Sequence, residues 1–444
     1  MDQTRQYRIS CTSLPAVSAV LMAILAFVLA AAALQPAHAQ TFTVLHAFTG
    51  INGDGDQSLA GVVLDSAGNL YGTTWLGGDL NCEGGIGCGI VFKISSTGHE
   101  TVLYTFTGVT GQGRLPLGGV IRDAAGNLYG TTLSGGNPND CPSPLSGCGT
   151  VYQISTRGRE TVLYRFTGTN GDGALPQAGL LRDAAGNLYG TTYRGGTLNC
   201  PPPFGCGTVF KVNQQRKESV VYSFTNKHGD GTLPLSDVVL DTAGNLYGTT
   251  SNGGDLSCKP PAGCGTVFKI SSNGSKTVLH TFRGKRDGEI PIGGLIQDSA
   301  GNLYGTTQGE FKCTFSGTPC DNAFKITKSG KFIVLHNFTG ANGEGANPGG
   351  DLVQDPQGNL YGTTEAGGIS GCGNDSLGCG TIFKLDKHNR LTVLYSFKGG
   401  ADGAVPTGHL ARDSAGNLYG TNSIAGNFVC EQGGGCGLVY KLKP

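Results

Sequence analysis

One ten-residue stretch decides the fold of this chain: DSAGNLYGTT, which runs from Asp65 to Thr74. Its central string, GNLYG, occurs seven times with an Asp three residues ahead of each copy, and the copies begin at Gly68, Gly126, Gly186, Gly244, Gly301, Gly358 and Gly416. Each copy is followed by a loop with two cysteines, a GTVFKI-like run and a TVLYxF-like run. The chain therefore contains seven copies of one unit of about 58 residues.

Each unit is predicted to form four short β-strands, which in the first unit cover residues 62–65, 69–74, 90–94 and 101–106. These runs are rich in β-branched and aromatic residues, and they show no helical period. The Asp-x-x-Gly-Asn link between the first two strands predicts a type I turn closed by a left-handed Gly, with the Asp side chain accepting hydrogen bonds inside its own turn. Seven antiparallel four-stranded units indicate a β-propeller.

The two ends of the repeat region are out of phase by one strand. Residues 43–48 read as a fourth strand with no unit before it, and residues 437–442 read as a third strand with no fourth strand after it. Pairing the two segments completes a seventh blade and removes exposed sheet edges. We therefore expect an all-β protein: a seven-bladed β-propeller of four-stranded antiparallel blades, closed by the N-terminal strand and forming a single domain over residues 40–444.

The first 39 residues have the pattern of a signal peptide. Arg5 and Arg8 precede an apolar run over residues 17–34, and an A-x-A site ends at Ala39. An uncleaved anchor is the alternative, because an 18-residue apolar run is just long enough to span a bilayer. We expect cleavage after Ala39 and an exported monomer, either secreted, periplasmic or at the cell surface, with no membrane span in the mature chain.

The composition excludes two broad classes. Charged residues make up 14% of the chain and the formal net charge is zero, whereas nucleic-acid binding needs a basic patch and disorder couples low hydropathy to high net charge. No nucleic-acid partner is therefore expected.

The repeated D-x-x-G-N-L-Y-G-T-T and G-C-G-T-V-F-K-I units resemble the GloVer tandem repeats of exported bacterial proteins. More loosely, their first hairpin is similar to that of NHL-type propellers. The GloVer resemblance spans essentially all of residues 40–444 and implies an extracytoplasmic repeat protein. It carries no catalytic residue over to this chain.

Fourteen of the 15 cysteines follow the signal region, two in each unit and six or seven residues apart. In an exported chain this spacing predicts seven disulfides. Metal ligation is the rival interpretation, but two thiolates in a loop leave a structural zinc site half empty. The predicted pairs are Cys82 with Cys88, Cys141 with Cys148, Cys200 with Cys206, Cys258 with Cys264, Cys313 with Cys320, Cys372 with Cys379, and Cys430 with Cys436.

Strand parity places the long loops of every unit on one face of the ring, which is where a rigid scaffold usually carries its binding residues. Unlike most of the motif, the residues directly after the second strand differ from unit to unit. Aromatic and charged side chains among them are the candidate ligand-binding residues: Trp75, Tyr193, Arg194 and Glu365.

A second departure from the repeat lies four residues before the motif Asp. Four units have Gly there, and the others have Asp237, Asp351 and His409. These three residues are predicted to line the mouth of the central channel, where they could form an acid–base set or hold a divalent cation. Solvated polar groups that arose by neutral drift are the alternative. No cofactor is predicted.

Three units carry His in place of a fourth-strand Tyr, at His46, His280 and His336, which we interpret as strand packing rather than ligation. The loop after that strand carries an acid in most units, as at Asp54, for which we favour turn stabilisation over calcium binding.

Three functions are compatible with these features. The first is a scaffold that binds a glycan, a peptide or a protein through the long-loop face. The second is a propeller enzyme, a lyase or hydrolase, with its site at the channel mouth. The third is a structural component of the cell envelope. The sequence has no G-x-S-x-G, H-E-x-x-H or P-loop motif, which favours the first and third over catalysis.

Overall fold

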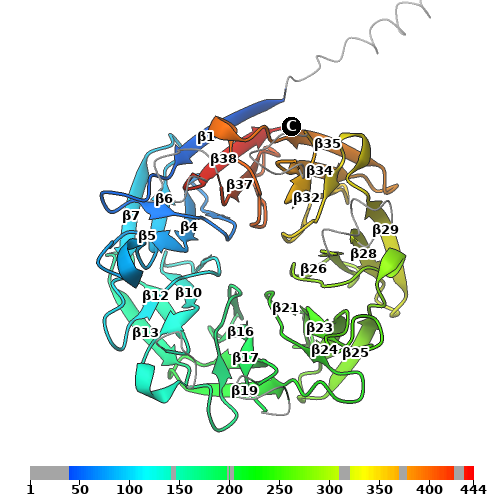
Figure 1. Cartoon of the computed structure of the whole chain (residues 1–444), viewed down its shortest axis with the longest axis horizontal. Coiled ribbons are helices and arrows are strands. Elements are labelled where there is room, and N and C mark those ends of the chain that lie inside the picture. The colour runs from blue at the N-terminus through cyan, green and yellow to red at the C-terminus, as the bar shows by residue number, and fades with distance from the viewer. Residues whose placement is uncertain are drawn as a thin grey trace, which may run out of the picture. The chain divides into compact units, whose positions relative to one another are not determined.

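The computed structural model describes residues 40–141, 147–197, 200, 205–309, 321–369, 378–424 and 435–444. Within it, Thr41–Pro444 forms one compact unit of seven four-stranded antiparallel sheets arranged as a ring (Figure 1). The predicted seven-bladed all-β propeller is thereby confirmed. No helix in the described ranges is long and apolar enough to cross a membrane.

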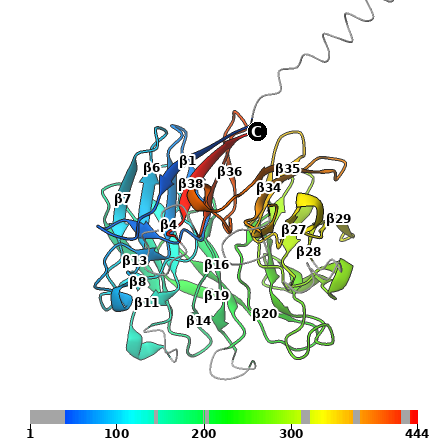
Figure 2. The same cartoon turned by 45° about the horizontal axis from the view of Figure 1, so that its top comes forward.

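Every blade has the same strand order, from a two-residue inner strand to a longer outer strand (Figures 1 and 2). Blade 1 consists of β3 (Val63–Leu64), β4 (Leu70–Thr74), β6 (Ile90–Ile94) and β7 (Glu100–Thr105), close to the predicted ranges. Blade 2 consists of β9 (Ile121–Arg122), β10 (Leu128–Thr132), β12 (Thr150–Ile154) and β13 (Glu160–Arg165). Blade 3 consists of β15 (Leu181–Arg182), β16 (Leu188–Thr192), β18 (Thr208–Val212) and β19 (Glu218–Ser223). Blade 4 consists of β21 (Val239–Leu240), β22 (Leu246–Thr250), β24 (Thr266–Ile270) and β25 (Lys276–Thr281). Blade 5 consists of β26 (Ile296–Gln297), β27 (Leu303–Thr307), β28 (Asp321–Ile326) and β29 (Phe332–Phe338). Blade 6 consists of β31 (Val353–Gln354), β32 (Leu360–Thr364), β34 (Thr381–Leu385) and β35 (Leu391–Ser396).

Blade 7 is built from both ends of the propeller. Its inner strands are β36 (Ala411–Arg412), β37 (Leu418–Asn422) and β38 (Leu438–Lys443), and its outer strand is β1 (Thr41–Ala47). Strands β1 and β38 pair antiparallel from Thr41 opposite Lys443 to Ala47 opposite Leu438. The predicted closure by the N-terminal strand is therefore present.

The motif that identifies the repeat forms the hairpin between the two inner strands. The amide of Gly68 donates to the carbonyl of Asp65 over 3.1 Å, and Gly68 has a φ of 79°, which favours Gly. Oδ1 of Asp65 accepts from the amides of Ala67 and Asn69, and Oδ2 accepts from the hydroxyl of Tyr71 at 3.0 Å. The motif Tyr and Asp are bonded in the same way in the other six blades, so the seven tyrosines are structural, as predicted.

The core lies between neighbouring blades. Phe48 of one blade packs against Phe92 of the next, with ring centroids 5.1 Å apart, and Phe106 meets Tyr152 of the following blade at 5.2 Å. A Cβ added to the motif Gly72 would lie 2.5 Å from Cζ of Phe92. The second Gly of GNLYG is therefore required because the aromatic side chain of the third strand occupies that space.

Among the described residues, five blades carry an additional two-stranded ribbon on the long-loop face, which the sequence did not predict. The ribbons pair the loop before each blade with the loop after its second strand: β2 (Gly55–Asp56) with β5 (Leu76–Gly77), β8 (Gly113–Arg114) with β11 (Ser134–Gly135), β14 (Gly173–Ala174) with β17 (Arg194–Gly195), β20 (Gly231–Thr232) with β23 (Asn252–Gly253), and β30 (Gly345–Ala346) with β33 (Ala366–Gly367). Short 3-10 turns lie in the same loops at Glu83–Gly85, Pro138–Asp140, Lys285–Asp287, Ala341–Gly343 and Gly400–Asp402.

Disulfides close these loops where both cysteines are described. The bonded pairs are Cys82–Cys88, Cys141–Cys148, Cys200–Cys206 and Cys258–Cys264. Cys379 and Cys436 are also disulfide-bonded, while their expected partners, Cys372 and Cys430, lie outside the described residues. In blade 5, Cys313 and Cys320 both lie outside the described residues. That pair stays a prediction.

Each disulfide loop is joined to the next blade through a residue with left-handed backbone. The amide of Leu115, at φ 58°, donates to the carbonyl of Cys88, and its own carbonyl accepts from the amide of Leu133. Gln57, Leu175, Leu233, Ile290 and Val405 occupy the same conformation and bond to the preceding disulfide cysteine in the same way. At Asn347 the acceptor is instead the carboxylate of Asp321, so Asp321 takes the part played elsewhere by a cysteine carbonyl.

Candidate functional site

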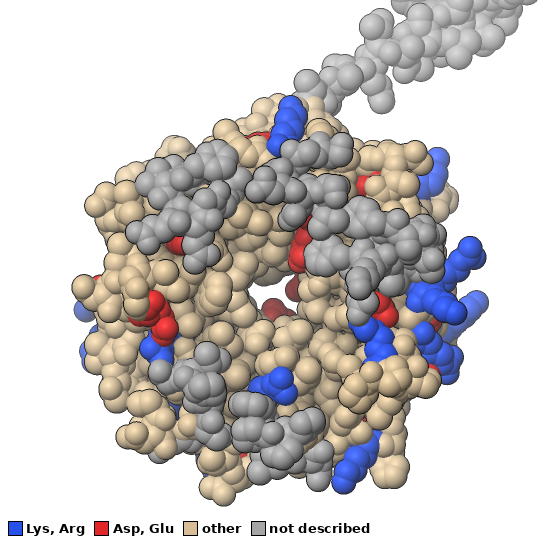
Figure 3. Space-filling view, in the orientation of Figure 1, with Lys and Arg blue, Asp and Glu red and all other residues tan. Residues whose placement is uncertain are grey.

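The narrow cavity at the centre of the ring measures about 130 Å³ and is lined by the segments that lead into the inner strands. Figure 3 shows this central opening, with acidic side chains visible at its wall. Asp237, Asp351 and His409 all belong to the lining. The three residues that depart from the repeat therefore lie where the sequence placed them, at the channel.

Each of these three side chains occupies space left by a glycine of a neighbouring blade. A Cβ at Gly179 would lie 3.0 Å from Oδ2 of Asp237, and a Cβ at Gly61 would lie 2.7 Å from Cγ of His409. The amide of Gly294 donates a hydrogen bond to the carboxylate of Asp351. Glycine in one blade and a polar side chain in the next are thus complementary around the channel.

The channel environment changes the acidity of Asp237. Desolvation in the narrow cavity raises its pKa to about 6; the negative charge of Asp351 adds to the rise, and His409 and the amide of Gly179 oppose it. The three groups therefore interact electrostatically. However, among the described residues they do not form a cluster whose ligand atoms all lie within 4.8 Å of one another, so the geometry does not favour the metal site.

The predicted ligand-binding residues lie on three different blades, at the same place in each. The backbone amides of Trp75, Tyr193 and Glu365 each donate to the carbonyl of the left-handed residue in the preceding loop. The Arg194 guanidinium stacks 4.5 Å from the ring centroid of Tyr193, and its Nη2 donates to the tyrosine hydroxyl at 3.3 Å. Tyr193 and Arg194 thus contact each other, whereas Nε1 of Trp75 is buried without a hydrogen-bond partner.

Glu365 makes a contact between two blades. Nε2 of Gln308, at the equivalent position of blade 5, donates to Oε2 of Glu365 at 2.7 Å. Burial raises the pKa of Glu365 to about 7; the Gln308 hydrogen bond opposes this rise and the carboxylate of Asp321 adds to it. Glu365 is therefore a titratable group near neutral pH.

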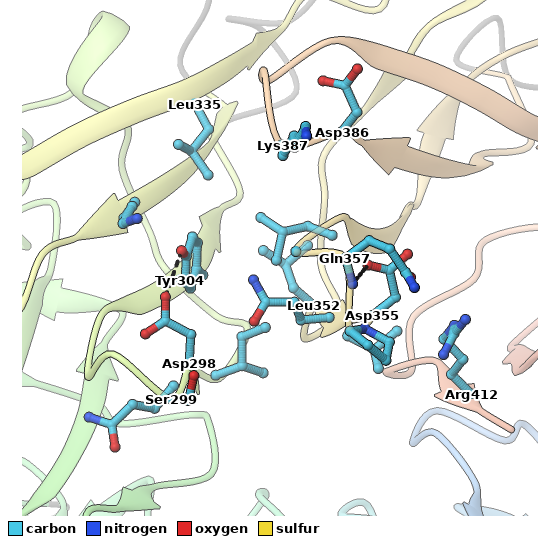
Figure 4. A pocket seen from close by; sticks show the side chains of 18 of the residues that line it. Asp298, Ser299, Tyr304, Leu335, Leu352, Asp355, Gln357, Asp386, Lys387 and Arg412 are labelled. Atoms are coloured by element: carbon cyan, nitrogen blue, oxygen red, sulfur yellow. Dashed lines mark hydrogen bonds between the residues drawn. The ribbon is translucent and has the colours of Figure 1, made fainter. Parts of the chain in front are cut away.

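A larger hollow lies on the opposite face, between blades 5 and 6, and the sequence did not predict it. This groove has a volume of about 1050 Å³ and is lined by the short turns, including Asp298, Asp355 and Asp386. Figure 4 shows Leu335 and Leu352 together with Gln357, Lys387 and Arg412 around it, and the hydroxyl of Tyr304 bonded to Asp298. The lining is mostly polar, with charges of both signs.

One residue position differs between the blade junctions beside the short turns. In three blades the residue before the motif Asp is an Arg whose guanidinium covers the motif Tyr of the preceding blade, as Arg122 covers Tyr71 at 5.5 Å and Arg412 covers Tyr361 at 6.0 Å. At the junction of blades 5 and 6 this residue is the shorter Gln354. The sequence carries this signal, but four junctions lack the Arg and the sequence does not distinguish among them.

The chain is similar in fold to several solved structures. A fungal alcohol oxidase of the AA5 family, solved with copper, matches at a TM-score of 0.54 and 11% identity, over 91% of this chain and 76% of the oxidase. An extracellular domain named for a hybrid two component system of B. thetaiotaomicron matches at a TM-score of 0.50 and 13% identity, over 91% of this chain. An extracellular domain named for a one component system of the same organism matches at 0.50 and 12%, over 90% of this chain. The chain spans about two fifths of the length of these two domains, 41% and 39%.

No curated protein sequence matches the chain significantly. The model of the Gloeobacter/Verrucomicrobia repeat matches residues 33–260, 82–318 and 260–444, which together cover the whole ring and all seven copies of the motif. With the motif, the hairpin that it builds and the closed ring in place, the chain belongs to the Gloeobacter/Verrucomicrobia repeat family.

Proposed function

We propose that this protein is an exported binding scaffold and that it binds an oligosaccharide in the groove between blades 5 and 6. The observation that carries the proposal is the groove itself, because its volume of about 1050 Å³ matches or slightly exceeds the roughly 300–1,000 Å³ of typical ligand sites. Export is supported by the disulfides, which persist in oxidising compartments.

The chemistry of the groove favours a neutral, polyhydroxyl ligand. Four amide side chains, those of Gln297, Gln354, Gln357 and Asn389, line it, and each offers both donors and acceptors. Acidic and basic side chains are interspersed around them, so the groove does not select a ligand of one net charge. Hydroxyl groups of a sugar can both donate to and accept from this set.

The test fills the groove with a larger side chain. Gln354→Arg introduces the residue that blades 2, 3 and 7 have at this position, where it covers the motif Tyr of the preceding blade, so the Arg side chain should occupy the groove and abolish binding. Leu240→Arg makes the same change at the junction of blades 3 and 4 and serves as the matched control. The oxidised protein is first screened on a glycan array, and the affinity for the best glycan is then measured by calorimetry for all three proteins.

Loss of binding in Gln354→Arg with retention in Leu240→Arg supports the proposal. Equal binding by both variants would place the ligand elsewhere, with the long-loop face around Trp75 and Tyr193 as the next site to test. A protein that binds no glycan but captures a peptide or protein would keep the scaffold function and change its ligand class, and one that binds neither would favour a structural role in the cell envelope.

An enzyme at the channel is the second candidate function, since Asp237, with a pKa of about 6, lies in the electrostatic field of Asp351 and His409. Such a group can donate or accept a proton near neutral pH. Activity against lyase and hydrolase substrates that disappears in Asp237→Asn, with glycan binding unchanged, would support it.

A further inference from the structure

The outer rim of the ring contains contacts between the outer strands of neighbouring blades. At five of the junctions, the Tyr or His near the end of one outer strand contacts the first residue of the next outer strand. The hydroxyl of Tyr104 donates to Glu160 at 2.9 Å, and Lys276 lies over the ring of Tyr222 at 5.6 Å. Equivalent positions at these junctions therefore carry different pairs of side chains.

The junction that closes the ring brings together an imidazole and two carboxylates. Nε2 of His46, on β1, lies 3.4 Å from Oδ1 of Asp54 and 3.8 Å from Oε2 of Glu100, on β7. One ligand atom from each of the three residues lies within 4.8 Å of the others. The side chains are mostly buried, with exposures of 20%, 14% and 15%.

The neighbouring histidines show that this arrangement is specific to the closing junction. His280 also contacts an acid, Asp287, at 3.2 Å, but the residue facing it from the next blade is Phe332, whose ring stacks on the imidazole at 3.7 Å. His336 pairs with Glu344, and the first residue of the next outer strand is Leu391. Only His46, among these three described histidines, has a second carboxylate opposite it.

One atom of the closing junction is unsatisfied. Oε1 of Glu100 is buried and has no hydrogen-bond partner, as at the equivalent Glu160 and Glu218, but here the carboxylate lies beside both Asp54 and the imidazole of His46. A buried carboxylate with an unpaired oxygen, next to a second carboxylate, is costly unless a cation is bound between them. A proton on His46 meets only part of this need, because Oε1 of Glu100 still has no hydrogen-bond donor.

We propose that His46, Asp54 and Glu100 bind one divalent transition-metal ion of the zinc type at the ring closure. An imidazole nitrogen and two carboxylate oxygens are ligands that Zn²⁺ accepts, and water completes a four-coordinate shell. Calcium is less suitable because it prefers an all-oxygen shell of six to eight ligands. The ion takes the place of the proton on His46 and joins β1 to β7, which belong to different blades.

The test is calorimetric titration of Zn²⁺ into EDTA-stripped, untagged protein at pH 7.5, with His46→Tyr and His280→Tyr as a matched pair. Both variants should fold, because Tyr occupies this position in four other blades. The expected result is one ion per chain for the unsubstituted protein, at least a hundredfold weaker binding for His46→Tyr, and unchanged binding for His280→Tyr. Binding should also weaken at pH 5.5, because protons compete for His46.

A second variant separates the metal from the fold. Glu100→Gln keeps the shape of the side chain, so Zn²⁺ should raise the melting temperature of the unsubstituted protein and leave that of Glu100→Gln unchanged. The proposal is overturned if the unsubstituted protein binds no Zn²⁺, if His46→Tyr binds it equally well, or if His280→Tyr loses binding to the same extent.

Discussion

At the scale of the residue, the carboxylate of the motif Asp organises the inner hairpin of each blade. Partial burial alone would raise the pKa of Asp65, but hydrogen bonds from the side chain and amide of Asn69, from Tyr71 and from the amide of Ala67 lower it to about 2 from its ordinary value of 3.8. The equivalent Asp of every other blade has a lowered pKa for similar reasons. A negative charge in the turn is therefore favoured by folding in all seven blades.

This carboxylate predicts how the propeller responds to acid. A depressed folded-state pKa stabilises the protein above the unfolded value, and this contribution is lost as the pH falls through the folded value. We therefore expect stability to fall between about pH 4 and pH 2. In an NMR titration Asp65 should have a midpoint near 2, and Tyr71→Phe should raise it because one donor is removed. A midpoint near 4 in the unsubstituted protein would contradict the hydrogen-bonded turn.

Glu218 predicts the opposite pH dependence. Burial raises the pKa of Glu218 to about 7, and the carboxylate of Asp172 adds to the rise. A raised folded-state pKa of an acid means that stability is present below its ordinary value near 4.5 and is lost as the pH rises through 7. Glu218→Gln should therefore raise the melting temperature at pH 8 and change it little at pH 4.

Glu218→Lys tests the same junction more strongly. Blade 4 already has Lys276 at the equivalent position, where its ammonium pairs with Asp230. The Lys variant should pair with Asp172 and be at least as stable as Glu218→Gln at pH 8. Thermal melts of the two variants at pH 4 and pH 8 decide the matter, and a Lys variant that is less stable than the unsubstituted protein at pH 8 would be incompatible with the contact.

The roles of Asp65 and Glu218 can be predicted from the sequence to different degrees. The role of Asp65 follows from a motif that lies within five residues and recurs seven times, so local turn chemistry is sufficient to predict it. The environment of Glu218 depends on Tyr164 and Asp172, which belong to the preceding blade. Such contacts depend on the packing of one blade against the next, and no local pattern encodes them.

At the scale of the element, the disulfide loops act as connectors between blades as well as closures of their own segments. The carbonyl of Cys264 accepts from the amide of Ile290, whose φ of 53° is unusual for a β-branched residue. A strained backbone of this kind persists only where its surroundings hold it in place. The disulfide therefore supports a conformation in the neighbouring blade.

Removing one disulfide should lower the stability of the protein moderately. The double substitution Cys258→Ser and Cys264→Ser opens a loop with a sequence separation of 6, for which chain entropy predicts a loss below the roughly 3 kcal/mol of a 15-residue loop. Denaturant unfolding of the oxidised proteins should show a loss of about 1–3 kcal/mol in the free energy of unfolding. No loss at all would mean that the ribbon β20–β23 holds the loop without the disulfide.

The elements also show where prediction from sequence ends. The strands follow from their composition and the tight turns from Gly and Asp, so their ranges agree to within about two residues. The ribbons were missed because their strands are two residues long and rich in Gly, such as Gly55–Asp56 opposite Leu76–Gly77. Pairing between two loops leaves no periodic signal in the sequence.

At the scale of the whole molecule, the closure of the ring depends on a single strand. Strand β1 pairs with β38 from Thr41 to Ala47, with a bulge between Val44 and His46, and the ring of Phe42 stacks on that of Tyr395 in blade 6 at 4.2 Å. Without β1, the buried residues of β38 such as Val439 and Tyr440 would lose their cover, and β38 would become an exposed edge.

Deletion of the closing strand β1 should therefore lower the stability of the protein severely. A chain that begins at residue 50 should melt at a much lower temperature than one that begins at residue 40, or should fail to stay in solution, because blade 7 loses its outer strand. Differential scanning calorimetry of the two chains is the measurement. Equal melting temperatures would show that the ring does not depend on this closure.

The molecule as a whole was easier to predict than its sites. The seven copies of the motif predict the number of blades, and the offset between residues 43–48 and 437–442 predicts the mode of closure. Asp237, Asp351 and His409 were recognised as channel residues because they interrupt an otherwise constant Gly. The groove between blades 5 and 6 was not, because four junctions lack the Arg and the sequence does not show which of them is open.

The pairing of Thr41 with Lys443 has a consequence for the connectivity of the chain. These two residues lie side by side at the same end of blade 7, as Ile94 and Glu100 do in blade 1, where residues 95–99 link them. A linker of similar length from Pro444 to Thr41 would make the polypeptide of the ring a continuous circle. Circular permutation, with new termini cut into the loop after any outer strand, would then leave every blade intact, so the order in which the gene encodes the blades is one of seven equivalent choices.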